Sequence, residues 1–168
     1  MKRELTLADI AGYLPHKLQI ESQFDGKICT ANIWNLQGAI VANFKPILRP
    51  MSDLCEEITE QGYNEGKPFV PIVTMAKVAY KGVGDWGHPI YSGEVYQCSC
   101  NGIFYGFDPA DGSFIVCDQT GFPVFSPKQR DLFDLFHRLH FDYRDLIGAG
   151  LAVSVHDLKQ NPYEAANN

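Results

Sequence analysis

The sequence predicts an α+β fold: one domain with two antiparallel β-meanders, several short helices, and one longer helix packed on a sheet. Two groups of β-prone runs, each broken by turn residues, indicate the meanders. Helix-start signals before, between and after these groups indicate the helices. With 168 residues, 45% of them apolar, the chain is long and apolar enough for one hydrophobic core. We expect the domain to cover residues 1–158 and residues 159–168 to form a mobile tail.

The first element is a short helix over about residues 7–14. Thr6 can cap it, Asp9 stands three residues later, and Leu5 and Ile10 are spaced as a hydrophobic staple. Three β-prone runs follow as KLQIESQF, ICTANIWNL and AIVANF, separated by DG and QG turns. These runs predict the first antiparallel meander.

The next helix is expected to begin at Ser52 or Asp53, after an extended link with two prolines, and to end at Gly62. Its solvent-exposed face is expected to carry Glu56, Glu57 and Glu60. An acidic surface for a basic partner is the alternative interpretation of these glutamates.

A further helix is expected from Pro71, at the first-turn position, to about Tyr80. Beyond it, residues 82–126 form an aromatic-rich insertion without Lys or Arg. Within the insertion, the runs GEVYQCSC, GIFYGFD and GSFIVCDQ predict the second meander, with DPADG as the hairpin turn between the last two.

The longer helix, over about residues 127–141, has the most complete start signal in the chain. Ser126 can cap it, Pro127 takes the first helical position, and Gln129 can close a capping box. Leu and Phe then recur at three- and four-residue spacing, which predicts one broad buried face. A short helix, Gly148 and a strand at LAVSV follow.

His140 and Asp142 stand two residues apart at the end of this helix. On one continuous helix their side chains would point about 200° apart and could not act as a catalytic pair. We therefore interpret the segment as a joint: the helix ends near Phe141, and Asp142 caps the next short helix. On this interpretation His140 is a hydrogen-bonded core histidine. A catalytic Asp142 is the alternative.

The net charge of −6 argues against binding to a phosphate backbone. No Lys or Arg occurs from Gly82 to Pro127, so nucleic acid is not expected as a partner. The N-terminus lacks the apolar stretch of a signal peptide, and no run reaches the ~20 apolar residues of a membrane span. We expect a cytoplasmic protein. The five cysteines are an odd number, which argues against a disulfide framework.

One set of residues could hold zinc. His137 and His140 share a helix face, and Cys98 and Cys100 point to the same side of one strand, so they could supply two nitrogen and two sulfur ligands. The pattern is weak, because zinc sites usually place two residues between paired cysteines. No cofactor is otherwise expected, and no phosphate-binding loop or nucleophile elbow occurs.

The aromatic residues of the insertion are more than one small sheet face needs. Because strand side chains alternate, both faces of the second sheet should carry rings. One face would pack on the core, and the other would be covered by a partner, a second copy or the loop around Trp86. The alternative is that all the rings form one internal core. The candidate partner-binding residues are Trp86, Tyr91, Tyr96, Tyr105 and Phe107.

Four segments stand in this order: LTLADIAGYLPHKL, FKPILRPMSDLCEEI, FVPI and LHFDYRDLIGAGLAVSV. On these segments the chain resembles a family of small uncharacterised proteins of Bacteroidetes phages, prophages and other mobile elements. The resemblance departs at Leu139, where the family pattern has Trp, and in the greater length of residues 82–126. It implies a phage setting and no mechanism.

We therefore expect a non-enzymatic phage or mobile-element accessory protein that binds another protein or itself. The alternatives are a zinc- or cysteine-dependent hydrolase and a virion component.

Overall fold

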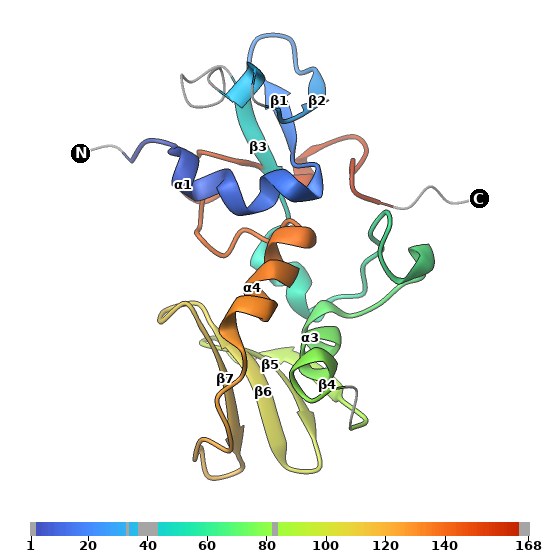
Figure 1. Cartoon of the computed structure of the whole chain (residues 1–168), viewed down its shortest axis with the longest axis vertical. Helices are drawn as coiled ribbons and strands as arrows, with labels where there is room; N and C mark the ends of the chain where they lie inside the picture. Colours follow the sequence, from blue (N-terminus) through green and yellow to red (C-terminus); the bar gives the residue numbers. More distant parts are fainter. Residues whose placement is uncertain (1–2, 33, 37–43, 82–83, 165–168) are drawn as a thin grey trace. The chain divides into compact units, whose positions relative to one another are not determined.

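The computed structural model describes residues 3–32, 34–36, 44–81 and 84–164. It confirms the α+β class, with two four-stranded sheets and several short helices (Figure 1). The chain divides into two compact units. Unit 1 consists of Met1–Met51 and Phe136–Pro162, and unit 2 of Ser52–Leu135 and Tyr163–Asn168. The larger part of unit 2 thus lies in the chain between the two parts of unit 1, and its smaller part follows them.

Unit 1 begins with α1 (Leu7–Ile10), which continues as the 3-10 helix η1 (Ala11–His16). The predicted pairing at its start is confirmed: Thr6 donates its amide hydrogen and its hydroxyl hydrogen to Asp9 Oδ2, at 2.9 and 2.7 Å. Both residues of the predicted staple, Leu5 and Ile10, are buried. The helix ends beyond Pro15, at Lys17, which adopts the left-handed conformation with φ 60°.

The sheet of unit 1 has the order β2-β1-β3-β8. Its strands are β1 (Gln19–Ser22), β2 (Ile28–Thr30), β3 (Phe44–Leu48) and β8 (Val153–Ser154). β1 pairs antiparallel with both β2 and β3, so antiparallel pairing is confirmed but the predicted meander order is wrong. β3 lies mostly in the segment predicted as an extended link, and it pairs parallel with β8. Strand spacing in the sequence could not predict this pairing, because β8 is about one hundred residues further along the chain than β3. The predicted strand residues 39–43 lie outside the described residues.

The second predicted strand is shorter than expected, because two asparagines start a helical turn inside it. The amide hydrogen of Asn32 is donated to Asn35 Oδ1 at 2.7 Å, and that of Asn35 to Asn32 Oδ1 at 3.1 Å. This reciprocal pair is the asparagine form of a capping box. Residues 34–36 are accordingly helical.

Unit 2 starts with a correction to the predicted helix at residues 52–62. The chain forms only the 3-10 helix η2 (Met51–Cys55) before it becomes extended. Ile58 and Phe69 exchange backbone hydrogen bonds of 2.9 and 3.0 Å, which hold the segment in an isolated β-bridge. Glu60 is therefore not on a solvated helix face and is only 4% exposed, while Glu56 and Glu57 are exposed as predicted.

After the short 3-10 helix η3 (Asn64–Gly66), α3 (Pro71–Ala79) has the predicted bounds, with Pro71 in its first turn. The second sheet, of order β4-β5-β6-β7, is antiparallel throughout, which confirms the second meander. Its strands are β4 (Gly87–Tyr91), β5 (Tyr96–Cys100), β6 (Ile103–Asp108) and β7 (Ser113–Asp118).

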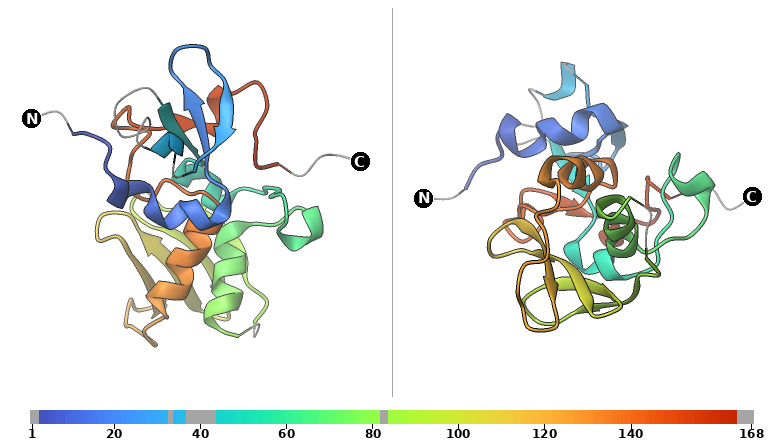
Figure 2. Two further views of the ribbon diagram at one scale, coloured as in Figure 1. Left: turned by 45° about the horizontal axis from the view of Figure 1, so that its top comes forward. Right: turned by 60° about the horizontal axis from the view of Figure 1, so that its bottom comes forward.

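One face of this sheet packs against helices. The Cys98 thiol contacts the Ile72 carbonyl of α3 at 3.7 Å. The Phe133 ring of α4 (Gln129–Arg138) lies 5.5 Å from the Phe114 ring and 6.4 Å from the Phe107 ring. α3 and the start of α4 thus cover the same face of the sheet, as two further views show (Figure 2). The predicted packing of the longer helix on a sheet is confirmed.

The predicted capping box at the start of α4 is wrong. The amide group of Gln129 binds the edge strand β7 and not Ser126. Its Oε1 accepts the amide hydrogen of Phe114 at 2.9 Å, and its Nε2 donates to the Phe114 carbonyl at 2.8 Å. Phe114 lies on the outer strand of the sheet, so its backbone groups need a partner beyond the sheet.

Candidate functional site

The segment around His140 and Asp142 is a joint between elements, as its sequence predicts. α4 ends in a Schellman motif: the His140 amide binds the His137 carbonyl at 3.2 Å, and the Phe141 amide binds the Phe136 carbonyl at 2.9 Å. His140 takes the left-handed conformation, with φ 60°. The Phe136 and Phe141 rings, 5.7 Å apart, supply the apolar contact that accompanies this motif.

Asp142 caps the next turn with both carboxylate oxygens. Oδ1 accepts the amide hydrogen of Leu146 at 2.8 Å, and Oδ2 that of Ile147 at 2.7 Å. Burial raises the pKa of Asp142, and these two hydrogen bonds only partly offset that effect. The short helix predicted after Asp142 is wrong, because the residues from Tyr143 to Gly150 form only turns. Its two oxygens are engaged by the backbone, so Asp142 has a structural role here.

The two candidate histidines lie in unit 1, and each has an ordered partner. His140 is buried, and its Nε2 lies 3.0 Å from the His16 carbonyl, to which it can only donate. His137 Nε2 lies 2.9 Å from the Tyr143 hydroxyl, and its ring packs edge-on to Tyr13 at 4.9 Å. Gly12 is required beneath it, because a Cβ atom at that position would overlap the His137 ring.

The two candidate cysteines lie on β5 in unit 2. Burial, followed by the neighbouring Cys55 and Cys100, raises the pKa of the Cys98 thiol to about 12. Cys98 is therefore protonated at neutral pH, whereas a nucleophilic cysteine reacts as the thiolate. Among the residues that the structure describes, no three His, Cys, Asp or Glu side chains are grouped as a metal ion would require. Zinc binding stays a prediction for metal analysis.

The aromatic candidates in the insertion have two different environments. The side chains of Trp86, Tyr105 and Phe107 are buried in the core of unit 2. Tyr91 is 48% exposed, and its ring stacks on that of Tyr96 at 4.4 Å. Strand register places Tyr91 in one row with Tyr96, Phe107 and Phe114 on the helix-covered face. The position of Tyr91 at the end of the edge strand β4, and not its face, therefore goes with its exposure. Of these candidates, Tyr91 offers a ring to solvent.

The opposite side of this sheet, here called the outer face, holds residues that sequence analysis missed. Cross-strand pairing forms two rows on it, which are Ile90, Gln97, Gly106, Ile115 and Gly87, Ser99, Phe104, Cys117. None of these side chains carries a charge. Ile90 is 55% exposed and Ile115 is 37% exposed. Side chains alternate between the two faces along each strand, so the residues next to Tyr105 and Phe107 belong to the outer face. Knowledge of the strand register would have extended this assignment to the other strands.

Acidic residues flank the outer face at both ends of its strands. Glu94 lies in the β4–β5 turn, and Asp108 and Asp111 lie at the β6–β7 turn, which a meander places at the same end of the sheet. Asp85 and Asp118 lie at the other end, before β4 and at the end of β7. The outer face is therefore an uncharged surface between two acidic margins.

Comparison of the chain with protein-family models, with curated proteins and with solved structures finds no match. The part of the chain that the structure describes holds no helix with the length and apolar character needed to cross a membrane.

Proposed function

We propose that this protein is a non-catalytic binding module whose outer face contacts a partner protein with an apolar centre and a basic margin. The observation that carries the proposal is the uncharged outer face between acidic ends. An antiparallel sheet face in water normally carries polar and charged side chains in alternation with the buried ones. Exposed apolar surface with a polar rim is typical of a protein contact.

The charge pattern favours a basic partner over a second copy of this chain. Two outer faces brought together would place acidic margins opposite each other, and residues 84–126 offer no Lys or Arg to pair with them. A basic margin on the partner would pair with these carboxylates and accelerate association at low salt.

The biological setting is part of the same proposal. The ILRPMSDL and HFDYRDLIGAGLA segments resemble those of proteins from Bacteroidetes phages and mobile elements. We place this protein among their accessory proteins, acting in the cytoplasm of the bacterial host.

The test is a capture experiment with tagged protein and nuclease-treated host lysate, followed by titration with the purified captured protein. The outer-face variant is Ile90→Ser with Ile115→Ser. The control is Leu7→Ser, which removes an exposed apolar side chain in unit 1. We expect the partner to bind the parent and the control equally and the outer-face variant at least about tenfold more weakly, a loss of about 1.4 kcal/mol.

Salt supplies the second readout. Binding should weaken as salt rises toward about 0.5 M, because the screening length falls to a few ångströms. Equal binding by the outer-face variant, or a captured protein without a basic surface, would refute the proposal. Thermal unfolding of both variants controls for loss of the fold.

A further inference from the structure

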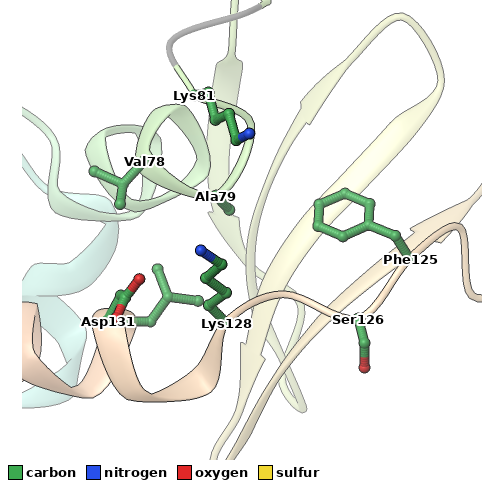
Figure 3. A pocket seen from close by; sticks show the side chains of 8 residues that line it. Val78, Ala79, Lys81, Phe125, Ser126, Lys128 and Asp131 are labelled. Atoms are coloured by element: carbon green, nitrogen blue, oxygen red, sulfur yellow. The ribbon is translucent and has the colours of Figure 1, made fainter.

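Unit 2 contains a cavity of about 250 Å³ between the end of α3 and the segment that begins α4 (Figure 3). Its apolar lining is Val78, Ala79, Phe125 and Leu132. Two cations, Lys81 and Lys128, stand at its walls from the two different segments. Figure 3 shows Lys128 extending from the segment before α4 toward Ala79 at the end of α3, with Lys81 just beyond that helix. The cavity therefore combines an apolar interior with positive charge.

The two lysines are not neutralised within the structure. Among the described residues, neither Lys81 nor Lys128 forms an ion pair. Asp131 also lines the cavity, but its Oδ1 is bound by Arg130 through Nη2 at 3.2 Å and Nε at 3.3 Å. In a chain of net charge −6, two exposed cations beside one apolar cavity form a local site for an anion.

The start of α4 adds to this positive potential. Ser126 and Gln129 do not cap the helix, and no side chain of the described residues accepts a hydrogen bond from its first-turn amides. Uncapped amides at a helix start carry partial positive charge and bind carboxylates. The helix start supports the lysine pair and would not define a site without the cavity.

The size of the cavity limits what can occupy it. Small-molecule and cofactor sites usually measure about 300–1,000 Å³, so this cavity is too small for most of them. One large apolar side chain of a peptide fits the volume, and a carboxylate next to it can reach the two lysines. We propose that the cavity binds an acidic peptide segment: it takes one large apolar side chain, and the two lysines hold the adjacent carboxylates.

This site differs from the outer face in location and in the charge of its ligand. The cavity lies on the helix-covered side of the sheet. Its proposed ligand is acidic, whereas the proposed partner of the outer face has a basic margin. Its test can therefore succeed or fail independently of the proposed partner protein.

The test uses fluorescence anisotropy with the full chain and a labelled octapeptide that has one Leu followed by two Glu in a Gly-Ser frame. Two matched peptides replace either the two Glu by Gln or the Leu by Ser. We expect saturable binding of the first peptide and an affinity lower by about tenfold or more for each of the others. Absence of saturable binding of the Leu-Glu-Glu peptide would overturn the proposal.

Protein variants locate the binding. Lys81→Gln with Lys128→Gln should weaken it by about tenfold, whereas Lys77→Gln, on α3 but outside the cavity lining, should leave it unchanged. The reversed pair Lys81→Glu with Lys128→Glu should prefer a Leu-Lys-Lys peptide. Unchanged binding by the Gln pair, with melting temperature as the folding control, would overturn the proposal.

The source of the carboxylate is tested by competition with sodium octanoate. We expect octanoate to displace the peptide poorly, since it supplies one charge and no backbone contacts. Octanoate that binds as tightly as the peptide would replace the peptide ligand by a free hydrophobic acid and refute the assignment. The outer-face variant Ile90→Ser with Ile115→Ser should bind the peptide normally.

Discussion

Asp9 and Asp142 are both buried carboxylates, yet their pKa values shift in opposite directions. Burial raises the pKa of each. At Asp9 the hydrogen bonds from Thr6 and the contact with the Arg3 guanidinium, 3.1 Å from Oδ1, outweigh burial and lower the pKa. At Asp142 only backbone amides oppose burial, and its pKa stays raised. The hydrogen bonds from Thr6 contribute most to the lowering of the Asp9 pKa, and Arg3 adds to it.

The lowered pKa of Asp9 gives a pH-dependent prediction. Because the folded-state pKa lies below the ordinary value of 3.8, the carboxylate stabilises the fold above that pH, and the contribution is lost as the pH falls through the folded-state pKa. Asp9→Asn should reduce the free energy of unfolding by about 1 kcal/mol at neutral pH. The difference from the parent should vanish near about pH 2 in urea titrations.

Glu4→Gln is the matched control for this experiment, because it removes an exposed neighbouring carboxylate outside the pairing with Thr6. A loss at Asp9→Asn that stays constant down to acid pH would contradict the assignment.

His140 gives a prediction about backbone strain. A residue other than glycine at a left-handed position costs about 1 kcal/mol, and His140 has φ 60°. Both His140→Gly and His140→Ala lose the buried ring, but only the glycine variant also removes the strain. We expect His140→Gly to be more stable than His140→Ala by about 1 kcal/mol in chemical denaturation.

A second Gly and Ala pair checks the sign of that effect. At Lys77, inside α3, the order should reverse, because glycine is about 1 kcal/mol less favourable than alanine in a helix interior. If the alanine variant were the more stable one at both positions, His140 would not be strained.

At the scale of elements, the side-chain amide of Gln129 hydrogen-bonds α4 to β7, beside the ring packing of Phe133 on the sheet. Gln129→Ala removes both hydrogen bonds to Phe114 and should lower the free energy of unfolding by about 1–3 kcal/mol. Amide hydrogen exchange measured by NMR should show faster exchange at Phe114. Arg130→Ala is the control: the two hydrogen bonds of the Arg130 side chain are both to Asp131, so Phe114 should stay protected.

Element boundaries show where local sequence is enough. The Thr6 and Pro71 signals predict helix starts correctly, since caps act within one turn. The helix predicted at residues 52–62 fails because Phe69, eleven residues beyond Ile58, pairs with it in a β-bridge. A contact between residues distant in the chain overrides the local helical pattern there.

At the scale of the whole molecule, the chain leaves unit 2 at Leu135 and returns to it at Tyr163. The Tyr163 side chain is buried, and its carbonyl accepts the Gln61 amide hydrogen at 2.7 Å. The segment predicted as a mobile tail is therefore anchored at this residue. Unit 2 is therefore formed by residues that precede and residues that follow the second part of unit 1 in the sequence.

This return gives a truncation prediction. A chain ending at Pro162 loses a buried aromatic side chain and should be less stable by about 3–5 kcal/mol, seen as a lower melting temperature. A chain ending at Glu164 keeps Tyr163 and should melt like the full chain. Equal melting of the two truncated chains would contradict a stabilising role for Tyr163.

The sequence alone determined the α+β class, the second antiparallel meander, the starts of α1 and α3, and the joint at Asp142. These features depend on residues within a few positions of one another, through capping, turns and side-chain alternation. The lack of charge on the outer face was also present in the sequence, but the row that contains Ile90 and Ile115 follows only from pairing across four strands.

Only the tertiary structure decided which aromatic residues are core and which are surface. Tyr91 and Tyr105 are similar in sequence context, yet one is half exposed and the other is buried beneath the helices. The cavity beside Lys81 and Lys128 likewise joins residues almost fifty positions apart. Strand register and helix packing decide which side chains are buried and which distant residues come together. Both depend on the free energy of the whole fold and not on any local segment.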